Sequence, residues 1–364
     1  MKDIMYGIKH STSNFEMMSE VITFLRFPLI ILVVCIHAQI SDMYTVNGWT
    51  AGLERFIGGY LSSGAVPAFF FISGYLFCRQ GLDWGRYKVK FSRRIHTLLI
   101  PFLLWSLIAF AVLSIWYLPI FNNYFENLHK VPYDLRLFLM SFIDRPVPEG
   151  VVSNHTPLNF PLWYLRDLII LVVFTPLIYK LRRYSTWVLL VLTVICSFIY
   201  IKECEYQFYS VLFYSIGVYH FSLPSTIDSP NGGGVRILLM AVLCFFLYYL
   251  SEFVLKEELS QLVHFIIKIL LIPLYFECAK VFVERGFRIP DILTRSTFFV
   301  FCIHGVFIGW LKVLFCRVFN LDHVLPEIFL FFLIIIITLT ISIGLYCVLQ
   351  KFTPKILAVL CGGR

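Results

Sequence analysis

The sequence has little charge: only 14% of its 364 residues are Asp, Glu, Lys or Arg, while 59% are hydrophobic. Such a composition lies outside the usual range of soluble globular domains. No polar stretch is long enough to form a separate soluble domain, and no internal repeat or low-complexity tract is present. The segment before the first apolar run also lacks a small-residue cleavage site, which disfavours a removable signal peptide. We therefore expect a polytopic membrane protein.

The ten cysteines show no CxxC spacing that would indicate a zinc or redox site. Most lie inside apolar runs, where a cysteine usually acts as a small hydrophobic side chain. We expect no metal and no tightly bound cofactor.

Apolar runs of the length that crosses about 30 Å of hydrocarbon as a helix recur along the chain. We predict about ten transmembrane helices in an all-α bundle, at residues 21–40, 58–78, 95–118, 162–180, 186–202, 206–221, 235–251, 259–281, 296–315 and 327–350. Together they predict one integral membrane domain over residues 1–364, with its core at 20–350.

The net charge of +8 follows the positions that topology requires, so it does not indicate nucleic-acid binding. With ten spans, four basic groups fall on one side of the membrane: Arg79, Arg86, Lys88, Lys90, Arg93 and Arg94; Lys180, Arg182 and Arg183; Lys280, Arg285, Arg288 and Arg295; Lys351, Lys355 and Arg364. The positive-inside rule makes that side cytoplasmic. Both termini are then cytoplasmic, and the loop at 119–161 is an ordered cap outside.

The run FLRFPLIILVVCIHAQI, residues 24–40, carries Arg26 at its start and His37 in its interior. Eleven residues are about three helical turns, so both side chains share one helix face about 16 Å apart. Ionisable groups at bilayer depth are costly and often mark a functional site. Arg26 could instead be a boundary anchor reaching the headgroups, and His37 a hydrogen-bonded interior residue.

Two further runs combine apolar residues with small or basic ones. VPAFFFISGYLF, residues 66–77, contains Ser73 and Gly74, which would let another helix approach closely. KVKFSRRIHTLLIPFLLW, residues 88–105, leads into span three through Lys90, Arg93 and Arg94. This basic run either reflects topology alone or binds the phosphates of a nucleotide.

The run NFPLWYLRDLIIL, residues 159–171, places Trp163, Arg166 and Asp167 at the outer start of span four. Neighbouring helical residues point in different directions, so we expect Arg166 and Asp167 to have separate partners. His304, Lys268 and Glu277 complete the intramembrane polar set. Structural pairing and catalysis are both open for these three.

In this order, the stretches resemble the acyltransferase 3 family of bacterial inner-membrane proteins, over about residues 20–350. Arg26 and His37 match the family's Arg/Lys, ten residues, His motif, and the phenylalanine-rich segment at 69–77, the basic approach to LLIPFLLW and PLWYLRDL follow. IH at 303–304 is similar to the family's late histidine-bearing helix. Where the family often has Arg-x-x-Arg, this chain has Lys90, Arg93 and Arg94, and it lacks the hydrolase-like domain fused to some relatives.

The resemblance implies transfer of an acyl group, most often acetyl, from cytoplasmic acyl-CoA to a hydroxyl or amine of an envelope glycan or related acceptor. Acyl-CoA is then a co-substrate, and the protein is a multi-pass protein of the inner membrane. His37 would be the general base or the acyl carrier, acting with Arg26 as the catalytic pair. Arg26, Lys90, Arg93 and Arg94 would hold the CoA, with Ser73 orienting the acyl group. Trp163, Arg166, Asp167 and His304 would border the acceptor.

Three other interpretations stay open. A proton-coupled transporter would use His, Lys and Glu as a relay, and its usual sign is an inverted repeat, which the sequence does not show. A non-catalytic component would only bind a lipid-linked glycan or a partner. An unrelated membrane O-acyltransferase architecture would use a histidine and an asparagine late in the chain, whereas the candidate here is in the first span. Binding of acetyl-CoA separates the enzyme from the first two.

Overall fold

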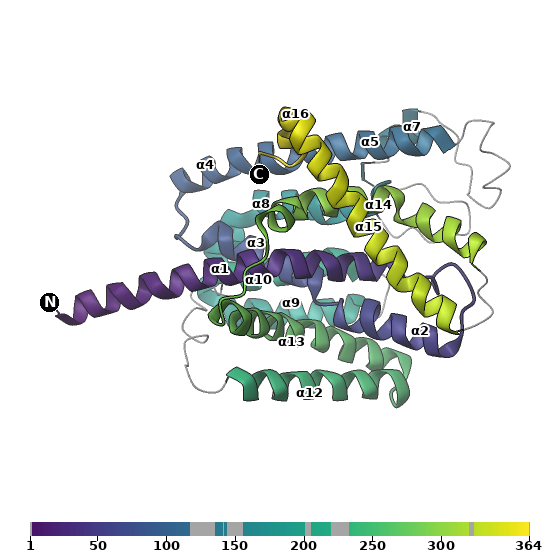
Figure 1. Ribbon diagram of the computed structural model, residues 1–364. Helices are drawn as coiled ribbons and strands as arrows, with labels where there is room; N and C mark the ends of the chain where they lie inside the picture. Colours follow the sequence, from purple (N-terminus) through teal and green to yellow (C-terminus); the bar gives the residue numbers. More distant parts are fainter. Residues whose placement is uncertain are drawn as a thin grey trace. The chain divides into compact units, whose positions relative to one another are not determined.

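The computed structural model describes residues 2–116, 135–140, 142–143, 156–200, 205–219, 233–319 and 324–363 (Figure 1). Every regular element in these residues is helical, which confirms the predicted all-α class. The α-helices are α1 (Lys2–Ala38), α2 (Gly48–Glu54), α3 (Ala65–Cys78), α4 (Trp84–Arg94), α5 (Ile100–Trp116), α7 (Leu135–Met140), α8 (Trp163–Leu181), α9 (Ser185–Tyr200), α10 (Glu205–Tyr219), α12 (Gly233–Phe253), α13 (Glu257–Glu284), α14 (Asp291–Val318), α15 (Val324–Phe352) and α16 (Pro354–Leu360). Most of the predicted outer cap at 119–161 lies outside the described residues.

Eight helical runs in the described residues are long and apolar enough to cross a membrane, so the chain is a multi-pass membrane protein. They are Glu16–Ala38, Gly48–Cys78, Trp84–Val112, Phe160–Ile195, Gly234–Phe253, Leu259–Glu284, Asp291–Val318 and Val324–Phe352. The predicted spans four and five fall together in the run Phe160–Ile195. The predicted span six corresponds to the shorter apolar helix Phe208–Tyr219.

The second helical run begins ten residues earlier than the sequence predicted, at Gly48 instead of residue 58. The side chain of Asn47 caps it by accepting a hydrogen bond from the Trp49 N–H at 3.0 Å. The run then passes from α2 through a π-helical segment, Arg55–Leu61, and a turn into α3. Because of this early start, Glu54 is part of a packed helix instead of a loop.

The chain forms two compact units, each built from two segments of the sequence. Unit 1 comprises Met1–Trp84 and Phe174–Thr297, and unit 2 comprises Gly85–Val173 and Phe298–Arg364. One boundary falls after Trp84, the first residue of α4, and the other two fall inside α8 and α14, so α8 and α14 each contribute several residues to both units.

In unit 1, α3 packs unusually closely on α10. A Cβ atom added at Gly74 of α3 would clash with the carbonyl oxygen of Tyr214, and one added at Gly217 of α10 would clash with the carbonyl oxygen of Phe71. The two glycines therefore let the two backbones touch, as small residues do between membrane helices. This confirms the close approach that the sequence predicted at Ser73 and Gly74.

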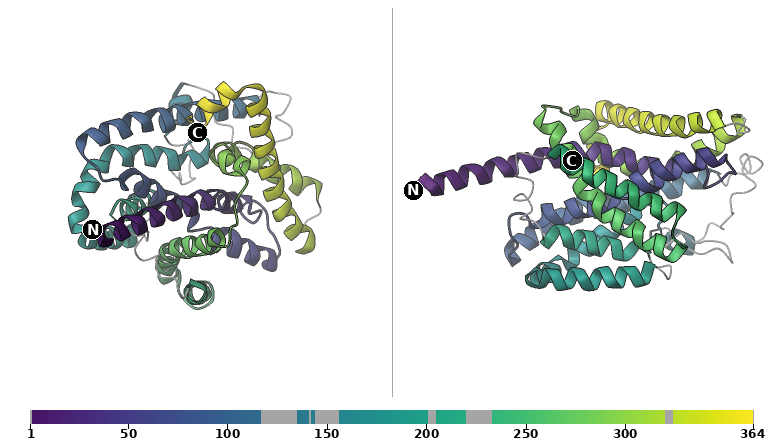
Figure 2. Two further views of the ribbon diagram at one scale, coloured as in Figure 1. Left: turned by 60° about the vertical axis from the view of Figure 1, so that its left-hand side comes forward. Right: turned by 90° about the horizontal axis from the view of Figure 1, so that it is seen from below.

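The other side of unit 1 is formed by α12 and α13, which lie side by side (Figures 1 and 2). Tyr60 of the π-helical segment is buried with Cys244 and Tyr248 of α12 and with Ile267 and Leu271 of α13. The outer face of α12 instead exposes large apolar side chains: Leu238, Leu239, Val242, Phe245 and Phe246. An exposed apolar face of this extent suits contact with lipid.

Unit 2 is centred on α5, α14 and the C-terminal helices. The Trp105 ring packs edge-on against Phe299, with ring centroids 5.3 Å apart, and its indole Nε1 donates to the carbonyl of Leu360 at 3.1 Å. Gly362, with φ at +66°, fits closely against the backbone of Thr97. The C-terminal segment is thereby held beside the start of α5.

Candidate functional site

Arg26 and His37 both belong to α1, which confirms that one helix carries the two residues. Arg26 is exposed and His37 is half-buried. The helix ends at Ala38, so His37 lies in the last helical turn, whereas the sequence had placed it in the interior of the span. The difference arises because the apolar run continues past the helix end into a turn beginning at Ser41.

The face of α1 between Arg26 and His37 is covered by packing. Ile30 and Val33 lie on that face, and their side chains are only 0% and 2% exposed. An extended ligand therefore cannot lie flat along this face in the conformation seen. Arg26 and His37 therefore lie at the two ends of a buried stretch of this helix face.

The end of α1 is fixed by the α2 segment. The backbone N–H groups of Ile40 and Ser41 donate to the Glu54 carboxylate, at 2.9 Å to Oε1 and 3.0 Å to Oε2. The π-helical segment also packs closely on α1 at Gly58. A Cβ atom added there would lie only 2.9 Å from the carbonyl oxygen of Cys35. The last turn of α1, which carries His37, is therefore closely held by the chain that follows it.

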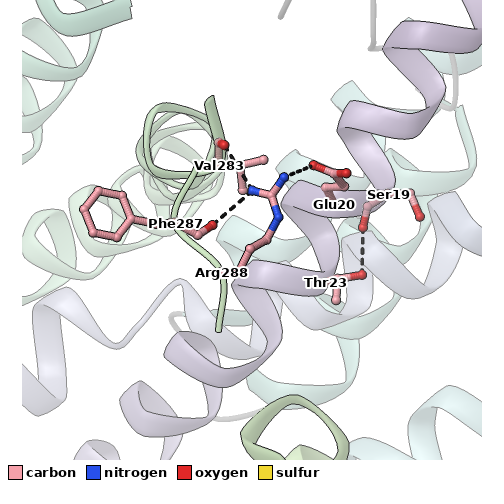
Figure 3. Close-up of polar contacts among 6 residues, drawn as sticks. All are labelled: Ser19, Glu20, Thr23, Val283, Phe287 and Arg288. Carbon is pink, nitrogen blue, oxygen red and sulfur yellow. Dashed lines mark hydrogen bonds and ion pairs between the residues drawn. The ribbon is translucent and has the colours of Figure 1, made fainter. Parts of the chain in front are cut away.

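Near Arg26, a different contact holds α1 (Figure 3). Arg288, in the segment after α13, places its Nη2 atom 2.9 Å from Oε2 of Glu20, which precedes Arg26 by six residues on α1. Its Nη1 atom donates to the carbonyls of Val283 and Phe287, each at 3.1 Å. The Arg288 guanidinium group therefore caps the C-terminal end of α13 and also links it to α1.

Ser73 lies half-buried on α3, a helix that contacts α1 within unit 1. The predicted role of Ser73 in orienting an acyl group stays a prediction. Lys268 and Glu277, on α13, are in structural pairs. Lys268 Nζ lies 3.3 Å from the Tyr209 hydroxyl and 4.4 Å from its ring centroid, and Glu277 pairs with Arg236 at 3.8 Å.

The basic approach to span three belongs to unit 2. Lys90, Arg93 and Arg94 lie in the last two turns of α4, where Arg93 is exposed and the other two are half-buried. The Tyr87 hydroxyl donates to the carbonyl of Val173 in α8 at 3.2 Å and so fixes α4 against that helix. The three cations are thus presented by a rigid helix end, followed directly by the π-helical segment Ile95–Leu99.

Trp163, Arg166 and Asp167 lie in the first turns of α8, as predicted, but the separate partners expected for the last two are wrong. Arg166 Nε donates to Asp167 Oδ1 at 3.0 Å, and its Nη2 atom is also 3.0 Å from that oxygen. The long arginine side chain folds back to its neighbour because Asp167 is buried, and a buried carboxylate is costly without a cation. Arg166 Nη1 also donates to the carbonyl of Ile143 at 2.8 Å.

His304, in the middle of α14, is fully buried at 0% exposure. Its Nδ1 atom lies 3.0 Å from the carbonyl of Val300. A carbonyl can only accept, so Nδ1 carries the proton and Nε2 holds the lone pair in the neutral ring. The ring packs edge-on against Phe160, with centroids 6.1 Å apart. This contact brings the segment before α8 onto the His304 turn.

Asn159 is the polar residue of this segment that the sequence did not single out. It is 1% exposed, and its Nδ2 atom donates to the carbonyl of Cys302 in α14 at 2.9 Å. Its Oδ1 atom has no hydrogen-bond partner in the described part of the chain. A Cβ added at Gly305 would meet Pro161 and lie 2.7 Å from Asn159 Oδ1, so α14 and the segment touch closely. The sequence does hold a signal for Asn159, because an Asn followed two residues later by a Pro, shortly before the helix that begins at Trp163, is typical of a turn.

The candidate residues therefore fall into two sets. Unit 1 holds Arg26, His37 and Ser73, and unit 2 holds Lys90, Arg93, Arg94, Trp163, Arg166, Asp167 and His304. Within unit 2, the structure joins Arg166 to Asp167 and the Asn159–Pro161 segment to His304 and Gly305. Among the residues that the structure describes, no cluster of three or more His, Cys, Asp or Glu side chains could hold a metal ion.

The sequence matches the family model of the acyltransferase domain over residues 20–347. This chain belongs to the acyltransferase 3 family. It is accordingly a membrane-embedded enzyme that transfers acyl groups. The chain is also similar to the succinoglycan biosynthesis protein ExoH of Rhizobium meliloti (strain 1021), with 26% identity over 94% of this chain and 92% of the relative. No solved structure matches.

Proposed function

We propose that this acyltransferase moves an acyl group, most often acetyl, from cytoplasmic acyl-CoA to a hydroxyl group of a cell-envelope polysaccharide. The family match supports acyl transfer, and the relative's name supports a polysaccharide acceptor. The observation that carries the proposal is the placement of Arg26 and His37 on one helix, at the spacing of the family's motif. An amine acceptor would be handled by the same chemistry.

In the proposed reaction, His37 accepts the proton of the acceptor hydroxyl as its oxygen attacks the thioester carbonyl carbon. The carbon–sulfur bond breaks, the ester forms, and the CoA sulfur leaves with the proton that the imidazolium returns. Imidazole suits this role because its ordinary pKa lies near neutral pH. In the other order of events, a ring nitrogen of His37 attacks the thioester carbonyl carbon and the CoA thiolate leaves. The acceptor oxygen then displaces the imidazole to form the ester, and the acceptor's proton passes to the thiolate.

The donor would be held through its phosphates by cationic side chains. Arg26 is proposed for this role in unit 1, and Lys90, Arg93 and Arg94 are proposed for it in unit 2, with Ser73 orienting the acyl group. Guanidinium groups bind phosphate in a bidentate manner, which suits this task. Because Ile30 and Val33 are buried, the pantetheine arm would pass beside the α1 face instead of along it.

The acceptor would meet Trp163 and the Arg166–Asp167 pair at the start of α8, with His304 behind them. Aromatic rings and paired polar side chains commonly bind the faces and hydroxyls of sugars. The transporter interpretation loses its main support, because Lys268 and Glu277 have structural partners and the family is an enzyme family.

The proposed topology has ten crossings of the inner membrane, with both termini in the cytoplasm. The run Phe160–Ile195 has 36 residues, about 54 Å of helix, which exceeds a bilayer's hydrocarbon thickness. Lys180, Arg182 and Arg183 lie in its middle, where the 3₁₀ turn Arg182–Tyr184 separates α8 from α9. Two crossings with these cations at the cytoplasmic surface avoid burying charge in lipid.

The test is turnover by the purified full-length protein in lipid nanodiscs. Radiolabelled acetyl-CoA or succinyl-CoA is supplied with the host's envelope polysaccharide, and label in the polymer and free CoA thiol are both measured. The proposal predicts equal amounts of the two, dependent on polymer, with acetyl-CoA as the better donor. A protein that binds neither donor and transfers no label would contradict it.

A further inference from the structure

Glu54 is a fully buried carboxylate whose two oxygens both bind backbone. Its side chain is 0% exposed, and the N–H groups of Ile40 and Ser41 reach one oxygen each, at 2.9 and 3.0 Å. An ionised carboxylate can only accept hydrogen bonds, and here each of its two oxygens accepts one from a backbone N–H. Such charge-assisted bonds are about twice as strong as neutral ones.

The backbone that Glu54 holds is the chain leaving the His37 turn. Ile40 is three residues after His37, and its own carbonyl accepts from the N–H groups of Met43 and Tyr44, each at 3.0 Å. Donor and acceptor groups of Ile40 are therefore both engaged. Helix ends normally fray because their last carbonyls lack partners, whereas the chain directly after this end is fixed.

The segment that follows Glu54 contacts the same turn of α1. Gly58 lies four residues later, and a Cβ there would come within 2.9 Å of the Cys35 carbonyl and 2.6 Å of Gln39 Nε2. Cys35, on α1, and Gln39, the first residue after α1, flank His37 in the sequence. Residues 54–58 thus contact the backbone on both sides of His37: Glu54 binds the N–H groups after it, and Gly58 packs against the Cys35 carbonyl before it.

A negative charge beside a helix C-terminus is opposed by the helix dipole. A neutral residue could fill the same space without that cost. What the carboxylate adds is two short, directed bonds to consecutive N–H groups. The carboxylate therefore serves mainly to fix the geometry of the turn after α1, and filling space is secondary.

We propose that Glu54 is a positioning residue that fixes the His37 imidazole for acyl transfer. The inference rests on the proposed function of His37. A catalytic side chain must be held tightly, and a misplacement of about 1 Å can cost about 100-fold in rate. Glu54 does not touch substrate; it acts through the backbone that carries His37.

The test compares Glu54→Gln with wild type in the nanodisc assay. Glutamine keeps the shape but turns an NH₂ group toward one of the two N–H donors, so one bond is lost. We expect kcat to fall by about 10- to 100-fold, with the KM for acetyl-CoA changed by less than about twofold. Glu54→Asp keeps the charge but draws both oxygens back from the N–H groups, so its kcat should fall as well.

The matched control is Glu277→Gln, because Glu277 is another carboxylate of unit 1 and pairs with Arg236, which lies outside α1. Both variants are compared at equal amounts of monodisperse protein, and Glu54→Asp replaces Glu54→Gln if the latter fails to fold. The inference is overturned if kcat stays within about twofold of wild type, or if the loss appears in KM or equally in the control.

The outcome also separates this inference from the proposed function. If His37→Ala turns over normally, the role of His37 is wrong and Glu54 has nothing to position. If His37→Ala loses turnover while Glu54→Gln keeps it, only the positioning role is wrong. A simultaneous loss, confined to kcat in Glu54→Gln, supports both.

Discussion

The two candidate histidines, His37 and His304, both lie within apolar helices of this enzyme, and they differ in access to a substrate. His304 is fully buried, with Nδ1 bound to its own helix and its ring packed against Phe160. His37 is half-buried in a terminal turn. A general base must come within hydrogen-bond reach of the proton that it removes. This favours His37 as the base and gives His304 a supporting place behind the start of α8.

Asn159 offers a residue-scale prediction, because its Nδ2 atom donates to the Cys302 carbonyl while its Oδ1 atom has no partner among the described residues. In Asn159→Ala, one buried hydrogen bond is lost, but an unsatisfied oxygen is also removed, so the free energy of unfolding should fall by only about 1 kcal/mol. In Asn159→Asp, a carboxylate oxygen would face the Cys302 carbonyl. We expect a further loss of about 1–3 kcal/mol.

Thermal unfolding of the two variants in detergent, followed by tryptophan fluorescence, measures this difference. Asn159→Asp should unfold at a clearly lower temperature than Asn159→Ala. Equal unfolding temperatures would show that the bond to Cys302 does not hold the segment before α8 onto α14.

At the scale of elements, the most constrained contact is that of α3 with α10. Gly74 and Gly217 each meet the backbone of the opposite helix. Gly74 lies against the carbonyl of Tyr214, and Gly217 lies against the carbonyl of Phe71. Any side chain at either position must push the helices apart. Helix α1, which carries His37, also contacts α3, so a shift of α3 would displace α1.

Gly217→Ala should therefore lower the free energy of unfolding by about 1–3 kcal/mol, the usual cost of overpacking. Gly59→Ala is the matched control, because a Cβ there meets nothing within 4 Å. Unfolding temperatures of both variants in the same detergent provide the measurement. A Gly217→Ala protein as stable as Gly59→Ala would contradict the close packing of α3 and α10.

The sequence predicted the helical class, most apolar spans and the glycine-mediated approach, because hydropathy and small residues act locally. It did not find Glu54, since GWTAGLER is too polar to be recognised as part of a span. It also missed the Arg166–Asp167 pair, because helical spacing describes backbone direction and not the reach of an arginine. Asn159 was missed because its hydrogen-bond partner, the Cys302 carbonyl, is far away in the sequence.

For the whole molecule, the number of crossings determines which surface meets each substrate. The proposed ten-crossing topology would place the residues before α8 and after α9 on the same, outer side. A single crossing of Phe160–Ile195 would instead place them on opposite sides. The lone cluster of cations inside this run makes two crossings the lower-energy arrangement.

Reporter fusions test this directly. Alkaline phosphatase, active only outside the cytoplasm, should be active when fused after Pro157 and also after Tyr200. Green fluorescent protein fused after Arg183 should fluoresce, because that position would be cytoplasmic. Activity at Pro157 combined with inactivity at Tyr200 would contradict the ten-crossing topology.

The central claim is that His37 carries out acyl transfer in this membrane enzyme. The most direct measurement is the kcat of His37→Ala for polysaccharide-dependent acyl transfer in nanodiscs. His96→Ala serves as the control, because His96 is exposed and its Nδ1 bonds to the carbonyl of Ser92, four residues earlier, at 2.9 Å. We predict that kcat falls by at least about 100-fold in His37→Ala, within the range for losing general-base catalysis, and stays near wild type in His96→Ala. Near-normal turnover by well-folded His37→Ala protein would contradict the account.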